Sequence, residues 1–150
     1  IKMKFWIGIA SQEHVLIGKE GGFCQLCHGK VAPLKRMKKG DFIIYYSSKK
    51  QMSDKTPYQK FTAIGQIIND ETYQVEMFKD FFPYRRDVSF FESIECSILP
   101  LINQLSFIQD KNHWGYPFRY GHLEIKKADF LTIASYMINI NILNQIKEDI

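Results

Sequence analysis

The chain has 150 residues and a mass of 17.7 kDa, which is the size of one domain with a genuine core and argues against a second domain. Apolar residues make up 45% of the sequence and charged residues 24%, as is ordinary for a globular protein. The net charge of +4 and the isoelectric point near 8.9 favour a polyanionic partner without establishing one.

No apolar run approaches the length of a membrane span, and the first residues lead into a strand-like pattern without the apolar core of a signal peptide. We therefore expect a cytoplasmic protein with no membrane partner. In that reducing compartment the three cysteines are expected to be free thiols. The aromatic fraction of 15% is high, and it suits both core packing and the stacking of flat rings.

The first half of the chain predicts strands separated by short helices. Residues 4–10 are nearly continuous in apolar side chains, which predicts a strand covered on both faces. Ser11 is placed to cap a helix over residues 12–20, and the glycines at 21 and 22 end it. A helical turn is expected at 33–37, a strand at 41–47, and an exposed loop at 48–60.

The second half predicts further strands and ends in helices. Strands are expected at 61–68, 73–78 and 84–91, with a turn at 69–72, and alternation in the last strand directs Arg86 inward. A buried guanidinium needs a partner, either a structural carboxylate or the phosphate or base edge of a ligand. Short helices are expected within 98–108, an aromatic loop at 112–122, a helix at 127–139, and a tail or helix extension at 139–150.

These elements comprise five or six strands with short helices, without a βαβ rhythm or an internal repeat. They predict an α+β protein built on a mixed, partly closed β-barrel. The sequence contains no phosphate-binding glycine loop, serine-hydrolase motif or zinc-protease motif, so no motif in it indicates an enzyme.

Residues 21–30, GGFCQLCHGK, concentrate more polar chemistry than a simple connector needs. One interpretation is a c-type haem attachment site at Cys24, Cys27 and His28, but haem is attached outside the cytoplasm in most systems. A second is a zinc or redox site, for which only Cys96 and scattered histidines are left as further ligands. A third is a ligand pocket walled by Phe23, Gln25 and His28. We expect no metal and no cofactor.

Eight segments in the same order resemble the EVE domain family in its small stand-alone form. They are 5–11 (FWIGIAS), 21–30 (GGFCQLCHGK), 33–37 (PLKRM), 40–41 (GD), 61–65 (FTAIG), 82–87 (FPYRRD), 100–101 (PL) and 114–119 (WGYPFR). The resemblance covers a core of about residues 4–138 within a single domain spanning 1–150. It implies a PUA-like fold, a mixed β pseudo-barrel with short flanking helices that is related to the YTH domains, which read methylated adenine in RNA.

The resemblance also implies binding of DNA or RNA, with a modified base held in an aromatic pocket. It suggests Phe23 and Trp114 as pocket aromatics and Ser11 and Gln25 as contacts to the base edge. The full set of expected ligand-binding residues is Ser11, Phe23, Gln25, His28, Trp114 and Phe118, with Lys30, Arg85, Arg86 and Arg119 on flanking phosphates.

Alternative interpretations stay open for these residues. Phe23 can equally be core, and the core is the ordinary place for Trp114 and Phe118. An enzyme or a small-molecule-binding protein could use the same pocket, with Cys27 as nucleophile and His28 or His113 as base, although no partner constellation is recognisable.

Overall fold

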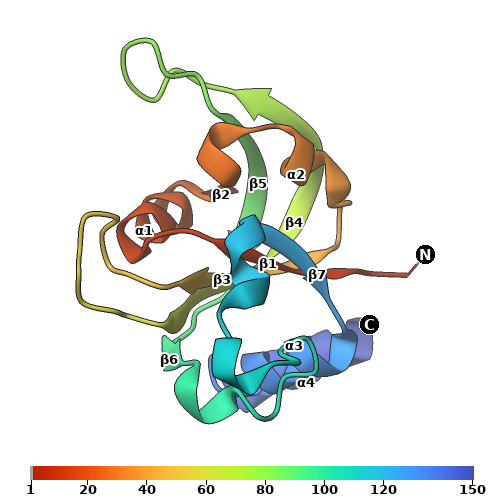
Figure 1. Ribbon diagram of the computed structural model, residues 1–150. Helices are drawn as coiled ribbons and strands as arrows, with labels where there is room; N and C mark the ends of the chain where they lie inside the picture. The colour runs from red at the N-terminus through yellow and green to blue at the C-terminus, as the bar shows by residue number, and fades with distance from the viewer. Residues whose placement is uncertain (1) are drawn as a thin grey trace.

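The computed structural model describes residues 2–150 and shows a mixed seven-stranded sheet surrounded by short helices (Figure 1). At its centre β1 (Phe5–Ile9) and β3 (Phe42–Ser47) run parallel, and every side chain of β3 is buried. β1 is likewise buried apart from its last residue, as its continuous apolar run predicts. These two strands place apolar side chains on both faces of the sheet.

The other strands extend the sheet from this pair in the order β2-β5-β4-β3-β1-β7, with β6 pairing β4. β4 (Lys60–Gln74) is antiparallel to β3 and carries β5 (Tyr84–Phe90), which in turn carries the short β2 (Phe23–Cys24). β7 (His122–Ile125) lies antiparallel to β1, and β6 (Cys96–Ser97) pairs with the start of β4. The site described below lies at the β2–β5 edge of this sheet.

Short helices cover both faces. They are α1 (Gln12–Gly21), α2 (Ala32–Arg36), α3 (Lys127–Ser135) and α4 (Ile140–Asp149), with 3-10 turns η1 (Cys27–Gly29), η2 (Leu99–Leu101), η3 (Lys111–His113) and η4 (Tyr116–Tyr120). In Figure 1 α3 and α4 pack below the sheet, whereas α2 lies above it and α1 at its left, and these two helices contribute to the other cluster. The two faces bury separate apolar clusters, one around Phe42 and Phe130 and the other around Trp6 and Leu34. This arrangement confirms the predicted α+β class and the PUA-like pseudo-barrel with short flanking helices.

Several predicted boundaries change. The turn expected at 69–72 is wrong, because β4 runs through it to Gln74 with a register shift against β5 between Ile67 and Thr72. Residues 122–125, expected partly as loop, form β7, and within 98–108 the only helix among the described residues is η2. Residues 139–150, expected as a tail or helix extension, form α4 with Leu143 and Ile146 buried.

Between β4 and β5 the chain leaves the sheet as a projecting arm, residues 75–83, at the top of Figure 1. A hydrogen bond from the Met77 amide to the Phe81 carbonyl at 3.0 Å closes it, and the rings of Phe78 and Phe81 stack 4.8 Å apart. Within residues 2–150 no helix has the length and apolarity needed to cross a membrane.

Candidate binding site at Phe23 and Gln25

Phe23 is the first residue of β2 and follows the end of α1 directly after Gly22. Ser11 caps the start of α1 by accepting a hydrogen bond from the His14 amide at 3.3 Å, and Gly22 ends the helix in the left-handed conformation with φ 74°. The chain then turns sharply, so the Phe23 ring folds back onto the helix, where a Cβ on Gly21 would lie 2.7 Å from ring atom Cδ2. The absence of a side chain at Gly21 makes room for the ring.

A guanidinium covers the other side of this ring. The central carbon of the Arg85 side chain lies 3.8 Å from the centroid of Phe23, in stacking contact. Phe23 is consequently only 7% exposed, although it belongs to neither of the two apolar clusters. It is a buried ring between glycine and arginine, outside the two apolar clusters, and in this conformation it is not an open pocket wall.

Gln25 provides a polar edge beside the ring. Its side chain is 4% exposed, and Oε1 accepts a hydrogen bond from Nε of Arg85 at 3.0 Å. Among residues 2–150 the amide nitrogen Nε2 has only the thioether sulfur of Met77 as partner, at 3.7 Å, which is a weak acceptor. A buried carboxamide therefore presents one satisfied acceptor and one poorly used donor.

Backbone hydrogen bonds hold Gln25 in place. The Tyr45 hydroxyl receives a bond from the Gln25 amide at 3.2 Å, and the Gln25 carbonyl lies 3.3 Å from Nε2 of His14. Burial lowers the pKa of His14, with the bond to Gln25 opposing and the positive charge of Arg85 adding to that lowering. His14 is thus a neutral ring at physiological pH and leaves Arg85 as the cation in contact with Phe23.

The 3-10 turn η1 forms the next wall and carries backbone strain. Cys27 and His28 adopt positive φ angles of 50° and 61°, and Gly29 follows at 82°. A non-glycine residue in this region costs of order 1 kcal/mol, so the surrounding contacts must hold the turn in place. Gly29 packs so closely on Pro83, at the base of the arm, that a Cβ there would overlap it. The turn and the arm are therefore one packed unit.

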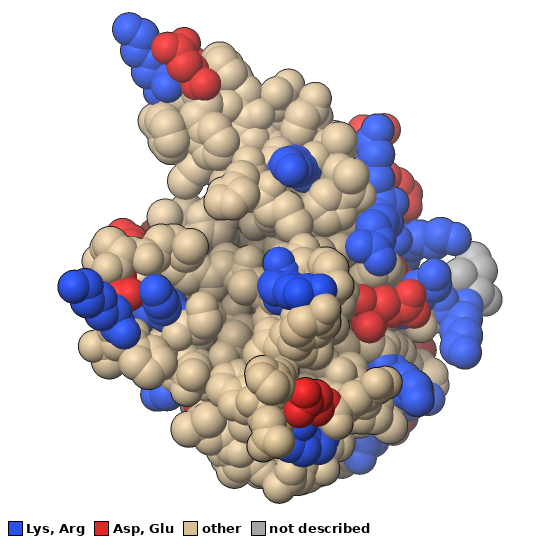
Figure 2. Space-filling model, in the orientation of Figure 1, with Lys and Arg blue, Asp and Glu red and all other residues tan. Residues whose placement is uncertain are grey.

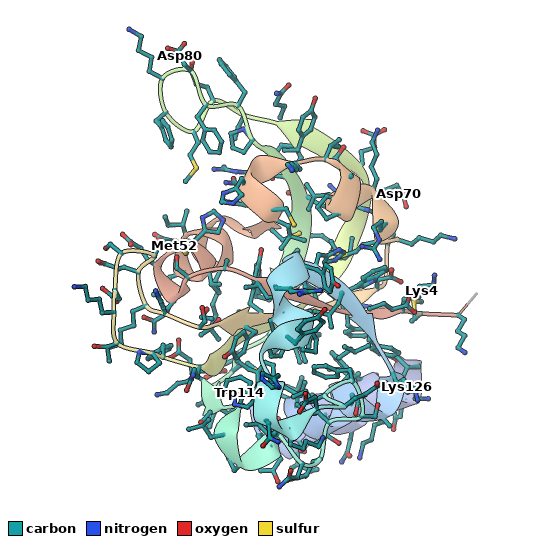
Figure 3. The ribbon with its side chains drawn as sticks, viewed as in Figure 1. Lys4, Met52, Asp70, Asp80, Trp114 and Lys126 are labelled. Carbon is teal, nitrogen blue, oxygen red and sulfur yellow. The ribbon has the colours of Figure 1, made fainter. Side chains whose placement is uncertain are left out.

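The arm exposes aromatic side chains that the sequence reasoning did not select. Phe78 is 62% exposed and Phe82 50%, while Met77 contacts Gln25. Asp80 marks the tip of the arm, away from the body of the protein (Figure 3). A pattern was available in the sequence: three phenylalanines within residues 78–82 around a Lys-Asp pair at the tip are unusual for an ordinary hairpin turn.

Trp114 and Phe118 lie elsewhere. Trp114 packs against the cluster that includes α3 and α4, and Figure 3 places it low in the molecule, whereas β2 and the arm lie in the upper half of Figure 1. Phe118 is buried and stacks on Tyr46 with ring centroids 4.3 Å apart. Phe23 and Trp114 therefore do not form one cage in this structure, because Trp114 packs against the cluster on the α3 and α4 side of the sheet.

The other polar residues among the expected ligand-binding set do not contact Phe23 and Gln25 through their side chains. Ser11 is buried, and its hydroxyl is used as the helix cap. His28 is exposed on η1, next to the site in sequence but without a hydrogen-bond partner among residues 2–150. Of the six expected ligand-binding residues, the structure brings Phe23 and Gln25 together directly, with His28 on the adjacent turn.

Arg86 differs from the other expected phosphate contacts. It is 3% exposed, and its guanidinium donates to the carbonyls of Leu34 at 2.8 Å, of Asn69 at 2.7 Å, and of Met37. The inward direction predicted from alternation is right, but its partners are three backbone carbonyls and, at 3.3 Å, Oδ1 of Asn69, where a carboxylate or a ligand was expected. The guanidinium joins α2 to β4, and Arg86 also borders the first of the hollows described below.

Lys30 and Arg119 are exposed and accessible. The Arg119 guanidinium lies 3.5 Å from the ring centroid of Tyr116 and donates to the phenol oxygens of Tyr116 and, at 2.8 Å, Tyr120. That hydrogen bond lowers the pKa of Tyr120. Figure 2 shows a largely uncharged surface below the arm, whereas Lys and Arg gather at the edge over the N-terminal segment and the loop after α2.

The cysteines carry no sign of metal or thiolate chemistry. Burial raises the pKa of Cys24 to about 12 and also raises the pKa of Cys27, against the opposing charges of Lys30 and Arg36. In the described part of the chain all three cysteines are free, and no three His, Cys, Asp or Glu side chains gather as a metal site requires. A nucleophilic Cys27 would need the opposite shift of its pKa.

The Phe23 site is closed in this conformation. Hollows of about 610, 660 and 380 Å³ open elsewhere on the described surface, and neither Phe23 nor Gln25 lines any of them. The first hollow is bordered by Lys35, Lys38 and Lys39 but also by Asp70 and Glu71. Its charges are mixed. Among the features described above, only Phe23 and Gln25 combine a flat ring with a buried side-chain amide, and Arg85 contacts both of them.

The chain is similar to known proteins over most of its length. The chain is 52% identical over 135 residues to a UPF0310 protein of Streptococcus gordonii, covering 89% of this chain and 93% of the relative. It is 45% identical over 138 residues to the UPF0310 protein YdcG of Bacillus subtilis, covering 91% and 94%.

Solved structures share the fold at low identity. A crystal structure of a Pseudomonas syringae protein matches with a TM-score of 0.54 at 14% identity, covering 87% of this chain and 97% of that one. The structure of a hypothetical protein from Leishmania major matches with a TM-score of 0.53 at 8% identity, covering 97% and 98%. The family model described as EVE domain matches residues 4–136. The chain therefore belongs to the EVE domain family.

Proposed function

We propose that this protein is a nucleic-acid-binding module that holds one base, in a modified form, on the ring of Phe23 with its edge against Gln25. The nucleic acid is DNA or RNA in a single-stranded or flipped-out conformation, and the site acts in the cytoplasm. The observation that carries the proposal is the pairing of a flat ring with a buried carboxamide whose Nε2 donor has only a thioether as partner.

The energetics of base binding suit such a site. Extruding a base costs a few kcal/mol of stacking and pairing, and one aromatic stack returns about 1–3 kcal/mol. Hydrogen bonds to the base edge must supply the remainder, and a carboxamide both donates and accepts. Gln25 offers these two functions on one side chain at 4% exposure, where water competes little.

The surroundings favour a modified base over a plain one. Met77 contacts Gln25 through its sulfur, and the arm that carries it exposes Phe78 and Phe82. A methyl group beside the base edge would meet polarisable, apolar atoms in this position.

Phosphate contacts would come from the exposed cations near the site. Lys30 follows η1 directly, and Arg119 is exposed on η4, whose last residue accepts a weak hydrogen bond from the Cys27 thiol at 3.9 Å. Such contacts release counterions, so the affinity for an oligonucleotide should fall as salt rises. Discrimination among bases should persist at high salt, because stacking and the Gln25 contacts depend little on screening.

Fluorescence anisotropy with short labelled DNA and RNA oligonucleotides tests the proposal. Each oligonucleotide carries one methylated, hydroxymethylated or unmodified base, and each is titrated at two salt concentrations. The variants are Phe23→Leu, which keeps an apolar side chain but removes the ring, and Gln25→Leu, which removes the edge contacts. Trp114→Leu is the matched control, because it removes a ring on the opposite side of the sheet.

The proposal expects one modified base to bind at least tenfold more tightly than its unmodified form. That preference should be lost in Phe23→Leu and Gln25→Leu and kept in Trp114→Leu, with all three variants folded by circular dichroism. Equal binding of all oligonucleotides, unaffected by the Phe23 and Gln25 substitutions, would overturn it and leave a basic surface as the only contact.

A further inference from the structure

We infer that Arg85 occupies the base position in the free protein and moves onto an adjoining phosphate when a base takes its place. This inference rests on the proposed function and adds a ligand class: the site selects a base that carries a phosphate, in a nucleotide or a strand, over a free base or nucleoside. Arg85 is then the residue that sets this specificity.

Arg85 already makes the two contacts expected of a base. Its flat guanidinium stacks on Phe23 at 3.8 Å, and its Nε–H donates to Oε1 of Gln25 at 3.0 Å. A planar group with an N–H at its edge fills the same space with the same partners. A base cannot reach the exposed face of Phe23 while the guanidinium remains, since the opposite side of the ring is against Gly21.

The guanidinium is held weakly enough to leave. Its hydrogen-bond partner is a neutral amide, and no ion pair among residues 2–150 includes Arg85. Asp87, two residues along the same face of β5, instead accepts from the Tyr73 hydroxyl at 2.7 Å and from Asn69 at 3.2 Å. The half-buried charge of Arg85 is therefore uncompensated.

The neighbouring Arg86 shows what a fixed arginine looks like on the same strand. It is 3% exposed and donates to three backbone carbonyls, so its release would leave buried groups unpaired. Release of Arg85 leaves unpaired only Oε1 of Gln25, which the incoming base edge would then occupy. A phosphate is a stronger partner for the freed guanidinium than an amide, because it is charged and can accept two hydrogen bonds.

This exchange links the two halves of a nucleotide. A nucleoside must displace Arg85 from the ring and offers its guanidinium no new hydrogen-bond partner. A nucleotide also displaces Arg85, but its phosphate can accept hydrogen bonds from the freed guanidinium. Removing the Arg85 side chain should therefore help the nucleoside and harm the nucleotide. An arginine that simply contacts the ligand would, when removed, weaken the ligands that it touches and strengthen none.

Calorimetric titration separates these cases. The probes are 5-methylcytidine and N6-methyladenosine, each as the nucleoside, the 3′-monophosphate and the 5′-monophosphate. Wild-type protein is compared with Arg85→Ala, and Lys126→Ala is the control, because it removes one exposed positive charge at the far side of the molecule (Figure 3). For the probe that binds, Arg85→Ala should tighten the nucleoside roughly five- to tenfold, the worth of a partly exposed cation–π contact.

The same substitution should weaken the better-bound monophosphate roughly tenfold, because losing charge-assisted hydrogen bonds to the phosphate, worth roughly a hundredfold, outweighs the gain at the ring. Lys126→Ala should leave the ratio of monophosphate to nucleoside affinity at the wild-type value. An equal loss for nucleoside and monophosphate in Arg85→Ala, or no change in either, overturns the inference while leaving the proposed function in place.

A measurement on the free protein keeps the inference testable without any ligand. In wild-type protein the Nε–H resonance of Arg85 should be visible and protected from solvent exchange by NMR, and its side-chain protons should be shifted upfield by the Phe23 ring. Gln25→Glu should strengthen that protection, because a carboxylate would pair with the guanidinium. Rapid exchange and unshifted protons in both proteins would overturn the inference. If none of the probes binds to either wild type or Arg85→Ala, this measurement on the free protein decides the inference, and the oligonucleotide titrations decide the proposed function separately.

Discussion

His122 makes the stability of this fold depend on pH. Its ring is 4% exposed, stacks on Trp6 with centroids 4.7 Å apart, and has no hydrogen-bond partner for either nitrogen among the described residues. Burial lowers the pKa of His122 from 6.5 to about 4, and the positive charge of Arg36, which lies over Trp6, acts in the same direction.

The sign and size of the effect follow from this shift. Between pH 6.5 and 4 the unfolded chain binds a proton that the folded chain does not, so the free energy of unfolding rises with pH in that window. The contribution is complete above pH 6.5 and is lost as the pH falls towards 4. A shift from 6.5 to about 4 corresponds to about 3 kcal/mol, of which about 2 kcal/mol is lost by pH 5.

Urea denaturation at about pH 7.5 and pH 5 measures the effect in wild type and in His122→Phe, which keeps a flat ring against Trp6 without the titrating nitrogens. Wild type should lose about 2 kcal/mol more than the variant between these two pH values. Titration of His14 is common to both proteins and cancels in the comparison. An equal loss in both proteins would refute the assignment of the pH dependence to His122.

Three further substitutions or reactions test the packing around the site. Arg86→Met should destabilise the fold by about 3–5 kcal/mol in urea denaturation, since it leaves buried carbonyls without a donor, and a cost below about 1 kcal/mol would contradict the network. Gly21→Ala should destabilise by about 1–2 kcal/mol through overlap with the Phe23 ring, although alanine normally favours a helix. Gly115→Ala, with nothing within 4 Å, is its matched control and should stay within about 0.5 kcal/mol of wild type. At neutral pH a disulfide reagent should modify Cys27 slowly and Cys24 only after unfolding, because burial raises both pKa values, and fast labelling of either in folded protein would be inconsistent with this.

The local elements were predictable because their causes lie within a few residues. Ser11 caps α1, the glycines after residue 20 end it, and apolar runs form β1 and β3. Alternation placed Arg86 inside correctly, but its partners could not be read, because Leu34, Met37 and Asn69 are distant in sequence and provide backbone carbonyls that every residue has.

The composition of the site was less predictable than the fold. Gln25 and Phe23 were selected, but the guanidinium of Arg85 was expected on a phosphate and lies on the ring. That placement depends on the register of β2 against β5, which a two-residue strand does not encode in its own pattern. Trp114 was expected beside Phe23, yet it follows the aromatic loop onto the α3 and α4 side, because the sheet separates the two apolar clusters.

The most direct test of the account is to map where a nucleic acid binds. Backbone and side-chain NMR shifts are recorded while the modified oligonucleotide that binds best is added to labelled protein. The account predicts that the largest changes occur at Phe23, Gln25, Met77 and Arg85, with the ring protons of Phe23 shifted by a stacked base. Changes confined to the lysines at 35, 38 and 39, with the Phe23 ring unaffected, would contradict it.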